Sequence, residues 1–160
     1  MARILCFDYG AKRVGIAVTD EQRIISSPLE TYDTDKIFDF IDSYTDTNNV
    51  DLFLVGLPTN LKGLETDATK ITTDFIKKLR EKYKQVDVET YDERFTSKIA
   101  RDSLIFLGKN KKYRRKKSNI DKVSASIILQ SYLQRNSWYI QLYYMEIQFL
   151  EKELWKLLRV

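Results

Sequence analysis

The stretch ILCFDYGAKRVGIAVTD, residues 4–20, decides the fold of this chain. An apolar run ends at Asp8, a short turn follows, and a second apolar run with a glycine at position 15 leads to Asp20. Two strand patterns joined by so short a turn predict an antiparallel pair, and Gly15 is tolerated where another backbone passes close. Asp8 therefore places a carboxylate at the end of a strand that should be buried.

The rest of the chain adds strands and helices in alternation. Residues 23–32 predict a third strand, at the sheet edge because of Pro28. The further pattern is a helix over 37–44, a buried strand over 50–58, a helix over 68–79, a strand over 85–95, a helix from Thr96 or Ser97 to Leu107, and a helix over 118–135. The order β-β-β-α-β-α-β-α predicts an α/β fold with a five-stranded mixed sheet flanked by helices.

The length of 160 residues suits one domain with its own core, which we expect over residues 1–136. Residues 137–160 are expected to form a C-terminal amphipathic helical extension of that domain. Its apolar stripe has two alternative roles: it covers the domain itself, or it forms the surface of a symmetric homodimer.

Composition excludes several classes of chemistry. The chain has no histidine, which rules out His-containing catalytic triads and His-ligated zinc sites. The single cysteine, Cys6, lies in an apolar run and is expected to be a buried small hydrophobe in a reducing compartment. Without a secretory signal pattern or an apolar run of roughly 18 residues, we expect a cytoplasmic protein with no membrane partner.

The charge is concentrated in one segment. Of 27 basic residues, seven fall within 109–117, and the remaining 20 face 23 acidic residues, so the body of the protein is mildly acidic. The seven are Lys109, Lys111, Lys112, Arg114, Arg115, Lys116 and Lys117. Such a loop is the electrostatic footprint expected for a phosphate backbone, and Tyr113 within it could stack on a base. The alternative is a solvated charge run without a partner.

Acidic residues are predicted to converge where the strands end. Asp8 ends the first strand, Asp92 and Glu93 end the strand over 85–95, and Asp121 begins the helix over 118–135. In open α/β sheets, sites form at the carboxyl ends of strands. Gathered carboxylates raise one another's pKa, and a hard divalent cation relieves this, so the pattern predicts Mg²⁺ or Mn²⁺ and phosphodiester hydrolysis.

Each acid also has a structural alternative. Asp8 can begin a turn through its side chain, and Asp92 or Glu93 can stabilise a turn or an ion pair. Asp121 can complete a capping box begun by Ser118.

Four segments, in order, resemble the motifs of the YqgF/RuvX family: FDYGAKRVGIAVTD, VGLPTNLKGLE, YDERFTS and DKVSASIILQSYL. The resemblance runs from Ala2 to about Arg135 and implies an RNase H-like fold and nuclease activity, described for this family as Holliday junction resolution or pre-16S rRNA processing. It implies that Asp8, Glu93 and Asp121 are the catalytic metal ligands, with Asp92 as an unresolved neighbour of Glu93. It also implies phosphate contacts by Lys12, Arg13, Asn60 and Arg94.

The sequence therefore predicts a metal-dependent endonuclease acting on structured nucleic acid, either the 16S rRNA precursor or branched DNA. The first alternative is a non-catalytic nucleic-acid-binding module that keeps the fold and the basic segment. A nucleotide phosphotransferase built on the turn after Asp8 is disfavoured, because such enzymes close two domains around the nucleotide and this chain has room for one.

Overall fold

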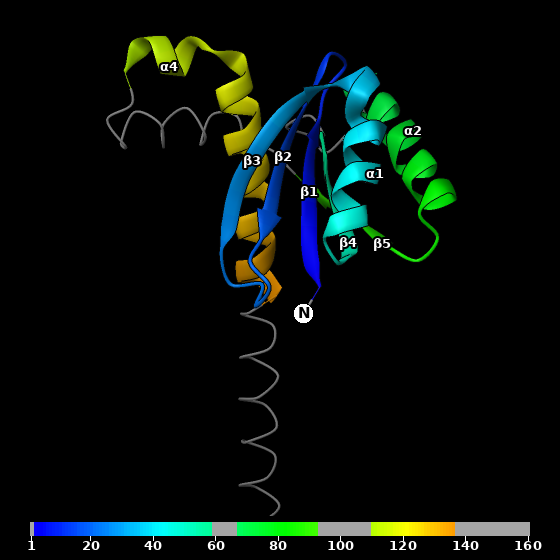
Figure 1. Cartoon of the computed structure of the whole chain (residues 1–160). Helices are drawn as coiled ribbons and strands as arrows, with labels where there is room; N and C mark the ends of the chain where they lie inside the picture. The colour runs from blue at the N-terminus through cyan, green and yellow to red at the C-terminus, as the bar shows by residue number, and fades with distance from the viewer. Residues whose placement is uncertain (1, 59–66, 93–109, 137–160) are drawn as a thin grey trace, which may run out of the picture. The chain divides into compact units, whose positions relative to one another are not determined.

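The computed structural model describes residues 2–58, 67–92 and 110–136 (Figure 1). The chain divides into two compact units, Met1–Gln130 and Ser131–Val160, which are treated separately. In the second unit the described residues, 131–136, are helical. The predicted helix of residues 96–107 and the extension over 137–160 lie outside the described residues, so the extension and its dimer surface stay predictions.

One five-stranded mixed sheet forms the centre of the first unit, as the sequence predicts. In sheet order the strands are β3 (Ser26–Asp33), β2 (Arg13–Thr19), β1 (Arg3–Tyr9), β4 (Val50–Leu57) and β5 (Asp87–Asp92). The strands β1, β2 and β3 are antiparallel neighbours, whereas β4 runs parallel to both β1 and β5. The predicted edge position of the third strand is confirmed.

The helices lie on both faces of the sheet. A short 3-10 turn, η1 (Thr34–Lys36), leads into α1 (Ile37–Thr47), which covers one face together with α2 (Asp67–Lys82). Residues 117–130 form a helix on the opposite face (Figure 1). Among the described residues, no helix is long and apolar enough to cross a membrane.

The basic segment differs from the prediction of a loop. Residues Lys111–Arg115 form a short helix, α4. The physical reason is that Lys and Arg have straight side chains that lose little freedom in a helix, so they favour helical structure where turn-forming residues are absent.

The main core lies between the sheet and the pair α1 and α2. Side chains alternate along β1, so Leu5 and Phe7 point to this face and are fully buried. Phe7 meets Phe53 and Phe75 edge to face, with ring centroids 5.7 and 5.6 Å apart. The ring of Tyr9 stacks on Phe75 at 4.1 Å and closes this core at the carboxyl end of β1.

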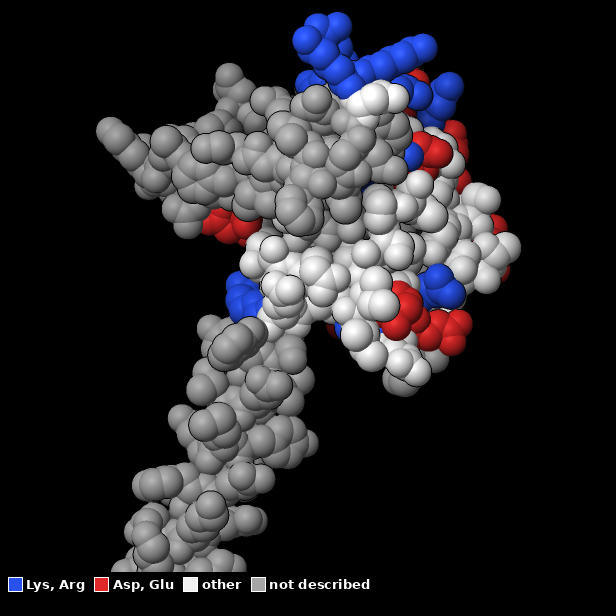
Figure 2. Space-filling model, turned by 90° about the vertical axis from the view of Figure 1, so that its left-hand side faces the viewer, with Lys and Arg blue, Asp and Glu red and all other residues white. Residues whose placement is uncertain are grey.

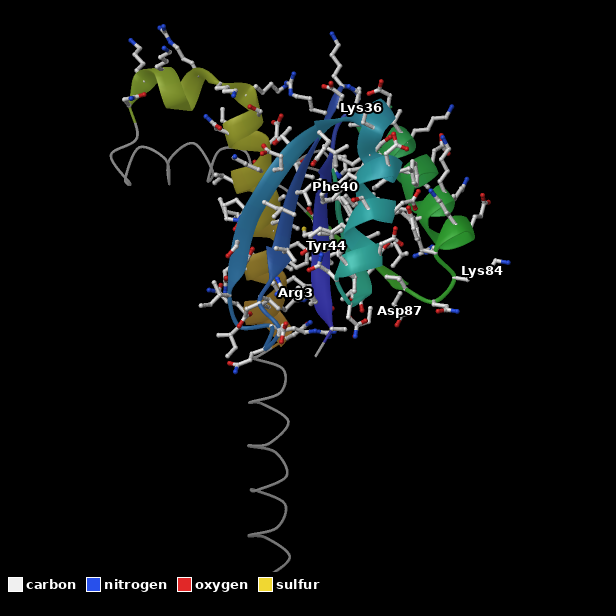
Figure 3. The ribbon with its side chains drawn as sticks, viewed as in Figure 1. Arg3, Lys36, Phe40, Tyr44, Lys84 and Asp87 are labelled. Carbon is white, nitrogen blue, oxygen red and sulfur yellow. The ribbon has the colours of Figure 1, made fainter. Side chains whose placement is uncertain are left out.

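An aromatic row covers the core between α1 and β3. Phe40 and Tyr44 lie one turn apart on α1 (Figure 3), with ring centroids 5.5 Å apart. The ring of Phe40 also lies 4.6 Å from that of Tyr32 on the edge strand. These half-buried rings shield the edge of the sheet from solvent on this face.

On the opposite face the sheet carries small residues, which lets the helix over 117–130 come close. A Cβ atom at Gly15 would lie 2.1 Å from the backbone oxygen of Asp121, so only glycine fits there. The predicted close approach at Gly15 is thus confirmed. Ala125 and Ile128 of the helix are fully buried on this side, and Cys6 is fully buried as expected.

Candidate active site

A cavity of about 410 Å³ opens at the carboxyl end of β1. Its lining comes from the end of β1, the β1–β2 turn and the first turns of the helix over 117–130. The lining residues are Asp8, Gly10, Ala11, Lys12, Arg13, Lys117 and Asp121. Segments more than 100 residues apart in sequence therefore build one site.

The sheet register explains why two of the predicted acids meet. Asp8 on β1 pairs with Gly15 on β2, so both residues share one face of the sheet. Gly15 lies against the backbone of Asp121. Because Gly15 adjoins both residues, it brings the strand-end carboxylate of Asp8 and the helix carboxylate of Asp121 to the same cavity.

The β1–β2 turn is fixed by a hydrogen bond within it and by two hydrogen bonds from Thr34, the residue that follows β3. The backbone N–H of Gly10 donates to the carbonyl of Arg13 at 2.9 Å, which closes the turn. The hydroxyl of Thr34 donates to the carbonyl of Gly10 at 2.8 Å, and the N–H of Thr34 donates to the carbonyl of Lys12 at 3.2 Å. Sequence reasoning missed Thr34, because nothing local links it to a turn more than 20 residues earlier.

Asp121 is held by an ion pair rather than by a helix cap. The Nε of Arg13 donates to Oδ2 of Asp121 at 3.1 Å, and the two side chains are 32% and 17% exposed. Ser118 lies within the helix, and its carbonyl accepts a hydrogen bond from Thr31. The capping-box alternative for Asp121 is therefore not what the structure shows. Arg13, predicted as a phosphate contact, lies in the cavity but binds a predicted metal ligand.

Asp92 is not brought to this cavity. Leu57 of β4 packs against the core under α1 and α2, and Asp92 is the register partner of Leu57. Asp92 thus lies on the α1 and α2 side of the sheet, whereas Asp8 lies on the side of the helix over 117–130. Paired residues of neighbouring strands share a face, so these two acids are on opposite faces.

Four predicted site residues lie outside the described residues: Asn60, Glu93, Arg94 and Lys109. The side chains of Tyr113 and Arg114 are outside the description as well.

The described cations of the basic segment are exposed beside the cavity. Lys117 lines the cavity itself, and the exposed cations before it belong to α4 and the residue that follows α4. They are Lys111, Lys112, Arg115 and Lys116. Figure 2 shows Lys and Arg side chains gathered at the end of the molecule where α4 lies. An acidic pair beside a cationic rim suits a polyanion held over bound metal.

The donor set fits a hard divalent cation. Mg²⁺ takes oxygen ligands and is held in proteins by one or two carboxylates together with water and substrate phosphates. Asp8 and Asp121 supply two carboxylates at one cavity. Within residues 2–58, 67–92 and 110–136, no group of three acidic, His or Cys side chains forms a complete site.

Comparison with solved structures concerns the fold. The chain matches the Fowlpox virus resolvase, solved with its substrate Holliday junction DNA, with a TM-score of 0.53 at 15% identity, covering 83% of this chain and 97% of the resolvase. This likeness concerns the fold alone and confirms the predicted RNase H-like class.

Comparison of sequences defines the family. The family model described as RuvX, Holliday junction resolvase, matches residues 2–135. A protein of Amoebophilus asiaticus is 44% identical over 133 residues, covering 83% of this chain and 94% of the relative. A protein of Phocaeicola vulgatus is 41% identical over 138 residues, covering 86% and 99%. Both relatives are named "Putative pre-16S rRNA nuclease".

The chain belongs to the RuvX family, and its activity class is that of an endonuclease. The resemblance drawn from the four sequence motifs is thereby confirmed over the same span of the chain.

Proposed function

We propose that this chain is a metal-dependent endonuclease that processes the 5′ side of the 16S rRNA precursor. One observation carries the proposal: Asp8 and Asp121, from distant parts of the chain, line one cavity together with three cations. The names of the relatives support RNA as the substrate. The description of the family model supports branched DNA as the second candidate.

The charged residues at the cavity and on α4 have separate tasks in this mechanism. Asp8 and Asp121 would hold Mg²⁺ or Mn²⁺, and the ion would supply an activated water and offset the negative charge on the leaving oxygen. Lys12 and Lys117, at the cavity wall, bind the phosphates on either side of the scissile bond. The exposed cations of α4 hold the backbone further along the strand.

Glu93, rather than Asp92, is the proposed third acid. The support is the position of Asp92 on the α1 and α2 face, away from Asp8. This leaves Glu93, the residue that the family resemblance implies as the middle acid, as the candidate to join Asp8 and Asp121.

The test is cleavage of two labelled substrates side by side: an RNA with the 5′ flank of 16S rRNA and a four-way DNA junction. Each is incubated with Mg²⁺, with Mn²⁺ or with chelator. We expect metal-dependent cutting of the RNA, lost in Asp8→Asn while the Kd for RNA is unchanged or lower. Cutting of the junction alone would establish the DNA alternative.

Thermal unfolding gives a second readout that does not depend on substrate. A divalent ion that binds only the folded protein raises its Tm. We expect this rise in wild type and its loss in Asp8→Asn. If neither substrate is cut and no metal-dependent rise appears, but RNA still binds, the chain is a nucleic-acid-binding module.

A further inference from the structure

Arg13 forms an ion pair with Asp121, one of the predicted metal ligands. Its Nε donates to Oδ2 of Asp121 at 3.1 Å. In the described part of the chain, neither side chain forms any other hydrogen bond or ion pair. Oδ1 of Asp121 and the two terminal amino groups of Arg13 therefore remain for other partners.

The backbone on both sides of this pair is fixed. Arg13 and Gly15 lie on the same face of β2, because side chains alternate along a strand. Gly15 holds the backbone of Asp121 against the sheet, where no Cβ would fit. The Arg13 side chain is about one-third exposed at the cavity. The pair can thus open by side-chain rotation, without movement of the helix.

The ion pair places two groups in competition. A divalent ion and the guanidinium of Arg13 are both positive and depend on the single negative charge of Asp121, so each weakens the binding of the other. A substrate phosphate and Asp121 are both negative and compete for the guanidinium in the same way. Among the described residues, Arg13 is the one of the three lining cations that forms an ion pair with a lining acid. The pair neutralises Asp121 when neither ligand is bound.

We propose that Arg13 is a counter-ion that exchanges partners: it binds Asp121 before loading and a substrate phosphate once a divalent ion binds Asp121. This inference rests on the proposed nuclease function. It makes the binding of metal and of nucleic acid mutually favourable, since each ligand releases the group that the other needs. By linkage, each ligand strengthens the binding of the other by the same factor.

The size of the effect follows from the exposure of the pair. An ion pair that is still partly exposed to solvent contributes up to about 1 kcal/mol, which corresponds to a change in affinity of roughly two- to fivefold.

The first test measures metal affinity without nucleic acid. Free Mn²⁺ is followed by its paramagnetic resonance signal during titration of wild type, Arg13→Gln and Lys12→Gln. Lys12 carries the same charge and lines the same cavity, but its side chain forms no ion pair with another described residue. We expect Arg13→Gln to bind Mn²⁺ roughly two- to fivefold more tightly and Lys12→Gln to change less. Equal gains in both variants, or no gain in Arg13→Gln, would overturn the exchange.

The second test measures nucleic-acid affinity in chelator and needs no metal. Asp121→Asn frees Arg13, whereas Asp8→Asn removes the same charge from the same cavity without breaking the pair. We expect Asp121→Asn to bind the RNA roughly two- to fivefold more tightly than Asp8→Asn. Adding Arg13→Gln to Asp121→Asn should remove that surplus. Equal binding by the two single variants contradicts the inference.

The two levels of proposal fail in different ways. Thermal unfolding of every variant is recorded first, so that only folded proteins are compared. Wild type that cuts neither substrate disproves the nuclease function. Wild type that cuts its substrate in a metal-dependent way, with no difference between the paired variants, disproves the exchange alone.

Discussion

Gly15 is the residue on which the geometry of the site depends. It pairs with Asp8 across the sheet and lies against the backbone of Asp121. A side chain at this position must push the helix away from the strand. The distance between the two carboxylates is therefore set by the absence of a side chain between them.

Gly15→Ala should destabilise the protein by about 1–3 kcal/mol, because the added methyl overpacks a backbone contact. Gly10→Ala is the graded comparison, since its Cβ would lie 2.9 Å from the carbonyl of Arg13, a milder clash than the 2.1 Å at Gly15. Urea unfolding measures both. A loss at Gly15 no larger than the loss at Gly10 would contradict the close approach.

The pair of adjacent acids at the end of β5 allows a test at single-residue resolution. Asp92→Asn should keep metal-dependent cleavage, because Asp92 lies on the face away from Asp8. Glu93→Gln should abolish cleavage while RNA binding persists. The measurement is single-turnover cleavage with Mg²⁺, and the reverse pattern would assign the middle acid to Asp92.

At the scale of elements, α1 and α2 are joined by a small polar cluster beside the aromatic core. The ammonium group of Lys82 donates to Asp42 Oδ2 at 2.6 Å, and the hydroxyl of Tyr83 donates to Oδ1 at 2.7 Å. Lys82 also lies 5.4 Å from the ring centroid of Phe38. The hydrogen bond from Lys82 is the larger cause, and that from Tyr83 the second, of a pKa of Asp42 below its ordinary value of 3.8. Burial and Asp42 raise the pKa of Tyr83.

A lowered carboxyl pKa stabilises the fold above the unfolded value, and the stabilisation is lost as the pH falls through the folded value. Asp42→Asn should therefore lower the free energy of unfolding at pH 7 by about 0.5–1 kcal/mol, discounted because both charged partners are nearly half exposed. Below pH 3.8 the difference from wild type should shrink. Asp46 lies on the same helix and forms no ion pair with another described residue, so Asp46→Asn is the control and should change little at either pH. The free energies of unfolding of wild type and both variants are measured with urea at pH 7 and pH 3.

At the scale of the whole molecule, charge is divided between a mildly acidic body and the basic segment 109–117. Its described cations are exposed at the end of the molecule that carries α4. Lys84 lies just beyond the end of α2, at the right of Figure 3, whereas α4 lies at the upper left of the same view. The affinity for a polyanion should therefore depend on the position of each cation on the surface and not on the net charge alone.

The association constant for RNA should fall with salt, with a slope of log K against log salt of roughly −4 to −6. Replacing Lys111 and Arg115 by Gln should make the slope shallower by about 2. Replacing the exposed Lys78 and Lys84 by Gln removes the same charge and should leave the slope nearly unchanged. Fluorescence anisotropy at several salt concentrations measures this. Equal effects of the two double variants would rule out the basic segment as the contact surface.

Local pattern determined most of the architecture. The two apolar runs in residues 4–20, the short turn between them and Pro28 in the third strand predict an antiparallel start with an edge strand. Buried Cys6 and the helix beyond the basic segment also followed from apolar spacing. Periodicity and connection length are properties of neighbouring residues, so a single sequence contains them.

Tertiary structure alone decided which side chains of the site contact one another and on which face of the sheet each acid lies. Arg13 and Asp121 are 108 positions apart, and no spacing rule links them. The face taken by Asp92 depends on the register between β4 and β5, because a shift of one residue would reverse it. Strand order, register and the contact at Gly15 depend on residues far apart in the sequence. They bring the acids and cations of distant segments together at one cavity.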